Sequence, residues 1–354
     1  MTGHQPYLNL IEPDSYPQLF FDHPPAGFDA GLSPSGLPLF MTGFDLLTTL
    51  DPAMRHRLKK TPLFKYWSGV LNWSACFWGT TITEYAPLPL HLNPAEAAEE
   101  MLGQACGSSL AIIKDLPLNS PLLPARDNEY SQSLAEAALE RGFFELSGQA
   151  LAYVPIDFAD TDEYLSRLSS GRRKDLRRKM KSSDRLSVEA LELGDPLLGE
   201  PAVLAEFYEM YLEVFRQSEI HFDLLNADFF QTLLSGRFAP GLAVIYRQYK
   251  TVVGVNICLT HGDRLIDKYI GFRYPLARQL NLYFVSWLYN LELAVSRGVK
   301  FYVAGWTDPE VKASLGADFT FTRHLVRIKN PFLRKVMRPL RRLFEADKKT
   351  VESL

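Results

Sequence analysis

The chain has 354 residues, of which 47% are hydrophobic and 22% charged, and its formal net charge is -3. This composition indicates a soluble globular protein with room for two cores, and it excludes large-scale disorder and a global attraction to nucleic acid. No window approaches about 18 uninterrupted apolar residues and the N-terminus lacks a signal-peptide pattern, so we expect a cytoplasmic protein. The cysteines lie far apart without ligand spacing, which predicts reduced thiols and no metal site: Cys76, Cys106 and Cys258.

The first half of the chain predicts a mixed α and β region. Residues 1–38 are rich in Pro, Gly, Asp and aromatic residues without any period, which predicts an irregular segment that wraps the outside of a domain. The periodic segments after it predict helices at Pro94–Cys106, Ser131–Arg141 and Asp160–Leu168, and strands at Gly43–Thr49, Trp73–Thr83, Leu110–Lys114 and Gln149–Ile156.

Residues 169–181 read SSGRRKDLRRKMK, in which seven basic residues accompany a single acid, Asp175. Leu176 and Met180 are the only apolar residues and lie four apart, so the stretch predicts a helix with a thin apolar seam and a wide cationic surface. A solvated charged surface is one interpretation. Because charges of one sign repel each other, we favour an anionic partner.

The second half is organised around a strand, loop, helix and strand without an intervening hairpin, which predicts a crossover. The first strand is Arg264–Phe272, and the helix Leu282–Arg297 is apolar over most of its surface, with only Asn290, Glu292 and Ser296 expected in solvent. The remaining segments predict strands at Ser187–Leu193, Gly241–Gln248, Val252–Thr260 and Val299–Val303, and helices at Pro201–Gln217 and Asp228–Leu234.

The loop before the Leu282 helix is a candidate phosphate-binding site. The first amides of a helix have no partners within it and carry the positive end of its dipole. Arg273 and Arg278 add positive charge beside them. An ordinary connection with two solvated arginines is the alternative interpretation.

Four segments in this order resemble the FemAB-like and BioF2-like acyltransferases of the GNAT superfamily, which include proteins of peptidoglycan, cellulose and exopolysaccharide synthesis: DEYLSRLSSGRRKDLRRKMK, YIGF, RGVKFYVAG and PEVKASLGADF. The resemblance implies an α/β (α+β) fold of tandem GNAT-like lobes, each with a mixed, centrally splayed sheet flanked by helices. We therefore expect an N-terminal lobe at 39–168, a basic helical connector at 169–186, a C-terminal acyltransferase lobe at 187–330 and a basic amphipathic tail at 331–354.

The resemblance also implies acyl transfer to an amine, with acyl-CoA as the donor and no metal. The donor pyrophosphate would lie at Arg273, Arg278, Gln279, Leu280 and Asn281. GNAT loops usually carry small residues at the two positions that hold Asn281 and Tyr283 here, so side chains would obstruct the approach of a phosphate. Some FemAB-like proteins use aminoacyl-tRNA instead.

Candidate catalytic residues follow from the same motifs. Lys312 lies in VKASLG, where the resemblance implies a cation that stabilises developing negative charge; an exposed helix lysine is the alternative. Asp267 and Tyr269 alternate on the strand beneath the expected cleft, where Asp267 is a candidate to accept a proton or to hold an ammonium group, although both residues also fit a structural role. Candidate substrate residues are Glu219, His221 and Trp306.

Three functions remain open at this point. The first, which we take as our prediction, is acyl transfer from a thioester to an amine of a sugar, a small molecule or an envelope precursor. The second is a Fem-like transfer from aminoacyl-tRNA, and the third is a non-catalytic module that binds an anionic ligand. The basic segments 172–181 and 334–342 are candidate contacts for tRNA or for an anionic membrane surface, which would place the protein at the inner face of the membrane.

Overall fold

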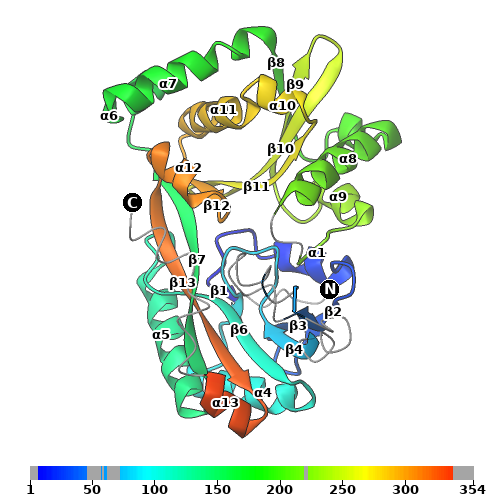
Figure 1. Ribbon diagram of the computed structural model, residues 1–354, viewed down its shortest axis with the longest axis vertical. Helices are drawn as coiled ribbons and strands as arrows, with labels where there is room; N and C mark the ends of the chain where they lie inside the picture. Colours follow the sequence, from blue (N-terminus) through cyan, green and yellow to red (C-terminus); the bar gives the residue numbers. More distant parts are fainter. Residues whose placement is uncertain (1–6, 46–56, 58–59, 62–71, 219–221, 338–354) are drawn as a thin grey trace. The chain divides into compact units, whose positions relative to one another are not determined.

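The computed structural model describes residues 7–45, 57, 60–61, 72–218 and 222–337. The chain forms two compact units, unit 1 (Met1–Ala150 with Thr320–Leu354) and unit 2 (Leu151–Phe319). Two strands carry the chain between them, β7 (Phe144–Pro155) on the way out and β13 (Asp318–Ile328) on the way back. The mixed α/β fold class predicted from the sequence is confirmed (Figure 1).

Unit 2 has the element order of one GNAT domain, as predicted. Its strands lie in the order β7, β12, β11, β10, β9, β8, with antiparallel neighbours except for the parallel pair β11 and β12. The elements are α6 (Thr161–Arg167), α7 (Ser170–Met180), β8 (Ser187–Glu192), α8 (Pro201–Gln217), α9 (Ala227–Leu234), β9 (Gly241–Gln248), β10 (Thr251–His261), β11 (Arg264–Phe272), α10 (Leu276–Gln279), α11 (Leu282–Ser296), β12 (Phe301–Gly305) and α12 (Pro309–Ser314).

Helices cover both faces of this sheet. On one face α11 buries Leu288 and Leu291 against Cys258 of β10 and Tyr302 of β12, and α6 and α7 pack on the outer side of α11. On the other face α8 lies against β11 so closely that a Cβ at Gly271 would be 3.0 Å from the Cβ of Met210. The sheet of unit 2 is therefore buried on both sides, as the long apolar runs of its strands indicate.

Unit 1 repeats the crossover in a smaller sheet. Its strands β2, β3, β4 and β6 are followed by β13 and the first half of β7, and β4 and β6 are parallel and joined through α4. Helices α4 and α5 pack together over one face, around Trp78 and Met101. The elements are β1 (Tyr7–Leu8), α1 (Tyr16–Asp22), β2 (Asp29–Leu32), β3 (Pro38–Asp45), β4 (Asn72–Trp78), β5 (Leu88–Pro89), α4 (Pro94–Gln104), β6 (Leu110–Pro117), α5 (Ala125–Glu140) and α13 (Pro331–Met337).

Several boundaries differ from those predicted. Residues 7–38 are not an irregular wrap, because they contain α1 and β2, and β2 pairs with β3. The strand predicted at Trp73–Thr83 ends at Trp78, since Gly79 has a φ of 119° that no strand residue adopts. The units divide between Ala150 and Leu151, so the basic helix α7 belongs to unit 2 instead of connecting two lobes.

Candidate active site

The two parallel strands of unit 2 diverge where the chemistry was predicted. Strands β11 and β12 pair only over Arg264–Ile266 and Phe301–Val303. Strand β11 continues to Phe272, so from Asp267 onward its edge has no strand partner on the β12 side within the described part of unit 2. Open α/β sheets bind ligands at the carboxyl ends of such strands, so this edge of β11 is a candidate ligand position.

A β-bulge sets the direction of the side chains at this point. Ile257 of β10 pairs with Tyr269, whereas the next residue, Cys258, pairs with Asp267, so Lys268 is the extra residue of the bulge. Asp267 consequently shares the sheet face of Cys258 and faces α11. Tyr269 lies on the opposite face, against Phe229 and Phe230 of α9 with ring centroids 5.6 and 5.4 Å away. Asp267 and Tyr269, two residues apart, would share one face of a regular strand; the bulge breaks this period of two and places them on opposite faces.

Three side chains from three elements donate hydrogen bonds to the Asp267 carboxylate. The Asn256 Nδ2 atom of β10 lies 2.6 Å from Oδ1, and the Tyr302 hydroxyl of β12 lies 2.8 Å from Oδ2. The Asn290 Nδ2 atom of α11 lies 3.2 Å from Oδ2 and 2.7 Å from Oδ1 of Asn256. These contacts fix the carboxylate in position at the end of the paired region, while Asp267 itself is only half-buried.

Burial raises the pKa of Asp267, and the three hydrogen bonds and the nearby Lys312 ammonium partly offset this effect. Burial also raises the pKa of Tyr302 well above its usual value, so this residue stays a phenol that donates to the carboxylate. A carboxylate with a raised pKa is a better proton acceptor than a solvated one. The arrangement therefore suits a general base.

Lys312 is buried, at 4% exposure, and not an exposed helix lysine. It projects from α12 and donates to the carbonyl oxygens of Ala304, at 2.6 Å, and Gly305, at 3.1 Å. These carbonyls end β12, so the ammonium group is held where β12 leaves the sheet. Its charge lowers the pKa of Asp267 and so opposes part of the effect of burial.

The predicted phosphate loop does not gather its residues around one point. The Arg273 guanidinium binds Glu206 of α8 at 2.8 Å and the Val252 carbonyl at 3.1 Å. Arg278 is exposed and binds Gln217 at 2.5 Å, and Gln279 is exposed. The other two predicted residues turn inward: Leu280 is 1% exposed in an apolar cluster, and Asn281, with a φ of 51°, donates to Ser182.

Of the three predicted substrate residues, the structure describes only Trp306. Glu219 and His221 lie outside the described residues, and Trp306 is half-buried directly after β12. The predicted basic segment 334–342 falls mostly outside the description as well, since only residues 334–337 of it lie in α13.

Sequence reasoning missed the three residues that hold Asp267. Asn256 and Asn290 are 0% exposed, so the expectation that Asn290 faces solvent is wrong. Asn256 interrupts the apolar run VVGVNICL of β10. A buried amide needs a partner, and this single polar residue in a central strand was the signal that could have identified the cluster.

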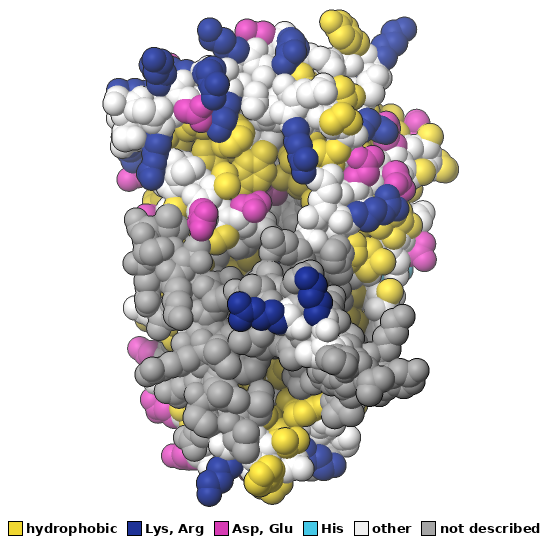
Figure 2. All heavy atoms as spheres, in the orientation of Figure 1, with side chains coloured by type: hydrophobic (Ala, Val, Ile, Leu, Met, Phe, Trp, Pro, Cys, Tyr) yellow, Lys and Arg dark blue, Asp and Glu magenta, His cyan; other side chains and the backbone are white. Residues whose placement is uncertain are grey.

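The basic helix α7 packs on α11 through Leu176, which is 3% exposed, and through Lys179, whose ammonium lies 3.5 Å above the ring of Phe284. Asp175 pairs with Lys179 and with Arg178. Figure 2 shows Lys and Arg side chains gathered over the end of unit 2 where α6 and α7 lie. The exposed basic residues of this surface are Arg167, Arg172, Lys174, Arg177, Arg178, Lys181 and Arg185.

In the described part of the chain, no group of three or more His, Cys, Asp and Glu residues is arranged to hold a metal ion. No described helix is long and apolar enough to cross a membrane.

Comparisons with known proteins concern the fold and the family of the chain. A comparison with curated proteins finds no match. Among solved structures, the chain is similar to the C-terminal domain of a candidate lysylphosphatidylglycerol synthetase from Agrobacterium fabrum, with 12% identity and a TM-score of 0.54 over 94% of this chain and 90% of that one. It is also similar to L-PGS from Bacillus licheniformis, with 11% identity and a TM-score of 0.53 over 95% and 98% of the two chains. At such identities these similarities concern the fold alone.

The model of the FemAB-like family, described as peptidoglycan biosynthesis or recognition, matches residues 125–352. This range includes all of unit 2 and covers well over half of the chain. The protein therefore belongs to the FemAB-like family, as the resemblance of its motifs predicted.

Proposed function

We propose that unit 2 transfers an acyl group from an activated donor to an amine, and that Asp267 receives the proton that the amine loses. The observation that carries this proposal is the Asp267 carboxylate, which three donors hold at the point where β11 and β12 diverge. An amine attacks an acyl group only in its neutral form, so a carboxylate with a raised pKa at the reaction site has a direct role.

Lys312 supplies the complementary charge. Attack on the acyl carbon places negative charge on its oxygen, and a buried ammonium stabilises that charge more than a solvated one does. Lys312 is buried and held by two backbone carbonyls, so its position is fixed before the substrates bind. We propose Lys312 as the residue that stabilises the tetrahedral intermediate.

An acyl thioester such as acyl-CoA is the first candidate donor. The edge of β11 beyond Ile266 has no strand partner in the described part of unit 2 and offers backbone amides and carbonyls to an extended chain. The pantetheine arm of CoA contains two amide groups and fits such an edge as an added strand does. The start of α11 and the exposed Arg278 lie beyond the end of the same strand and supply positive charge for the phosphates.

Aminoacyl-tRNA is a second candidate donor, favoured by two observations. Leu280 in the loop and Leu282 at the start of α11 are buried, and Arg273 is paired with Glu206, which weakens the expected pyrophosphate site. The exposed basic surface of α6 and α7 offers phosphate contacts of the kind that nucleic acids use.

The test is the thermal stability of the full chain with acetyl-CoA, a long-chain acyl-CoA, free CoA and bulk tRNA. A ligand at about 100 times its Kd stabilises the folded state by about 2.7 kcal/mol, which gives a clear shift in Tm. Arg278→Ala should abolish a shift caused by CoA species. Arg297→Ala, at the opposite end of α11, is the matched control and should leave that shift unchanged.

For tRNA, Arg172→Ala and Lys174→Ala should reduce the shift, and the exposed Lys250 in the β9–β10 turn provides the control. A shift with tRNA alone would replace the thioester by aminoacyl-tRNA as the donor. If neither CoA species nor tRNA changes the Tm, both donor assignments are wrong and a non-catalytic binding module becomes the better interpretation.

A further inference from the structure

A second polar cluster lies in unit 1, at the end of its own parallel strand pair. Strands β4 and β6 pair over Ala75–Trp78 and Leu110–Ile113. Lys114 and Asp115 follow directly on β6, just beyond the last paired residue. Ligands of open α/β sheets bind outside the carboxyl ends of parallel strands, so these two residues occupy a place where a ligand site is expected.

A β-bulge also shapes this cluster. On β13, Arg323 pairs with Leu116 and Leu325 pairs with Ile113, so Lys114 and Asp115 together face the single residue His324. Asp115 has a φ of 51°, in the left-handed region that favours glycine. Bulges change the direction of side chains and are frequent beside functional sites. Residues in strained backbone conformations also cluster at functional sites, so the strained and charged Asp115 is a second indication of a site here.

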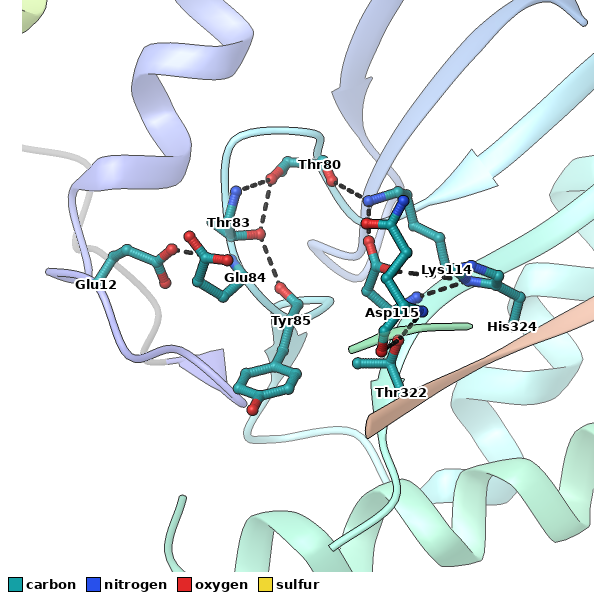
Figure 3. A network of polar contacts seen from close by, with 10 residues as sticks. Glu12, Thr80, Thr83, Glu84, Tyr85, Lys114, Asp115, Thr322 and His324 are labelled. Carbon is teal, nitrogen blue, oxygen red and sulfur yellow. Dashed lines mark hydrogen bonds and ion pairs between the residues drawn. The ribbon is translucent and has the colours of Figure 1, made fainter. Parts of the chain in front are cut away.

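The hydrogen bonds of the cluster determine which atoms it offers (Figure 3). The Lys114 ammonium binds the Thr80 carbonyl at 2.9 Å and forms an ion pair with Oδ2 of Asp115. The backbone amide of Asp115 donates to Nδ1 of His324 at 3.0 Å. Because Nδ1 accepts this bond, the proton of the neutral imidazole is on Nε2.

Three polar groups of the cluster remain without a hydrogen bond to any residue that the structure describes. They are the third ammonium proton of Lys114, the Nε2 proton of His324 and Oδ1 of Asp115. The side chains are partly open, with exposures of 15% for Lys114, 9% for Asp115 and 25% for His324. The cluster thus presents two donors and one acceptor to a ligand.

The charges of the cluster cancel. The Lys114 ammonium and the Asp115 carboxylate form an ion pair, and burial lowers the pKa of His324, which keeps the imidazole neutral. An anionic ligand would be repelled by Asp115, and a cationic ligand by Lys114. A hydroxyl group donates one hydrogen bond and accepts others, so two neighbouring hydroxyls match this set of donors and acceptor without any charge.

We propose that Lys114, Asp115 and His324 form a carbohydrate site in unit 1, in which one ring hydroxyl donates to Asp115 and accepts from His324 while its neighbour accepts from Lys114. All three residues belong to unit 1, whereas Asp267 belongs to unit 2, and the inference does not depend on the function proposed for unit 2. It identifies the ligand only by its chemistry, a pair of adjacent hydroxyls on a sugar ring.

The test uses saturation-transfer NMR on the full chain with methyl β-glucoside, methyl β-galactoside and methyl α-mannoside, which present neighbouring hydroxyls in different orientations. We expect transfer to the ring protons of at least one glycoside. His324→Asn keeps an acceptor for the Asp115 amide but removes the Nε2 donor, and Lys114→Met keeps the aliphatic stem but removes the ammonium. Each should weaken binding about tenfold, the effect of one lost hydrogen bond.

Glu129→Ala, an exposed change on α5 of the same unit, is the control and should bind as the wild type does. Far-UV circular dichroism and a thermal melt identify any variant that fails to fold. The proposal is overturned if none of the three glycosides receives transfer, or if a folded His324→Asn and a folded Lys114→Met both bind as tightly as the wild type. Displacement of the glycoside by millimolar acetate or phosphate would overturn the assignment to a neutral sugar.

Discussion

Replacing Tyr302 by phenylalanine tests whether the cluster in unit 2 exists to hold a carboxylate. Tyr302 is 1% exposed, and its hydroxyl donates to Oδ2 of Asp267 at 2.8 Å. Phenylalanine keeps the ring, which packs edge-on against Trp287 with centroids 5.3 Å apart. The substitution therefore removes little packing, and it removes the bond to Asp267 together with the bond that the hydroxyl accepts from Nδ2 of Asn290 at 3.2 Å.

The cost of Tyr302→Phe should depend on pH. When Asp267 is protonated, the lost bond joins two neutral groups and costs about 0.5–1.5 kcal/mol of unfolding free energy. When Asp267 is ionised, the lost bond is charge-assisted and costs about 1.5–3 kcal/mol. The pKa of Asp267 is higher in the folded state than in the unfolded state. The stability linked to this group is therefore fully present at a pH below the pKa of the unfolded carboxyl. It is lost as the pH rises through the pKa of Asp267 in the folded protein.

The variant should make this loss larger, because one of the groups that stabilise the ionised form is gone. The stability difference between wild type and Tyr302→Phe should therefore grow with pH, and urea unfolding at a series of pH values between about 4 and 8 measures it. Tyr289→Phe is the matched control: Tyr289 is a half-buried tyrosine of α11 whose ring packs edge-on against Tyr246. If both variants lose the same free energy at every pH, Tyr302 does not stabilise an ionised Asp267 and the reasoning is refuted.

Three further predictions concern single positions. Lys312→Met should lower the unfolding free energy by about 2–4 kcal/mol, because two backbone carbonyls lose their donor. The control Lys300→Met, at a side chain that is 75% exposed, should change the unfolding free energy by less than about 0.5 kcal/mol. Urea unfolding of both variants measures the difference. His324 has a lowered pKa in the folded state, so stability should fall as the pH drops below about 6.5, and His324→Asn should remove this dependence in unfolding titrations. Gly241→Ala should destabilise the folded protein by more than about 1 kcal/mol, because the added Cβ would collide with a backbone carbonyl of β10. Gly171→Ala in α7 places its Cβ in open space and should stabilise the folded protein by about 0.5–1 kcal/mol. Thermal melts of the two variants measure both effects.

The elements of unit 2 were predictable because their signals are local. Helix α8 runs from Pro201 to Gln217 and strands β9 and β11 have the predicted bounds. Proline at the first helical position and apolar runs between turns determine such boundaries, and they can be recognised in a single sequence. The GNAT-like fold was then predicted from the resemblance of four motifs in this order to FemAB-like proteins.

The candidate site was less predictable because it depends on contacts between distant residues. The bulge at Lys268 turns Asp267 and Tyr269 to opposite faces, and nothing in the local sequence marks it. Asn290 has the hydrophilic character of a surface residue, and only the position of Asn256 beside it in the fold explains why it is buried. In unit 1, His324 and Asp115 are 209 residues apart in the chain, so no spacing motif can join them.

The burial of Asn256 and Asn290 argues for function over stability. Both amides are 0% exposed in an otherwise apolar layer, and apolar residues of similar volume in their place would generally make a core at least as stable. Their donors converge on one carboxylate that burial makes costly to ionise. A cluster that holds one ionisable group in position at a cost in stability is expected where that group takes part in a reaction. Asp267 is therefore the position from which a search for the substrate should begin.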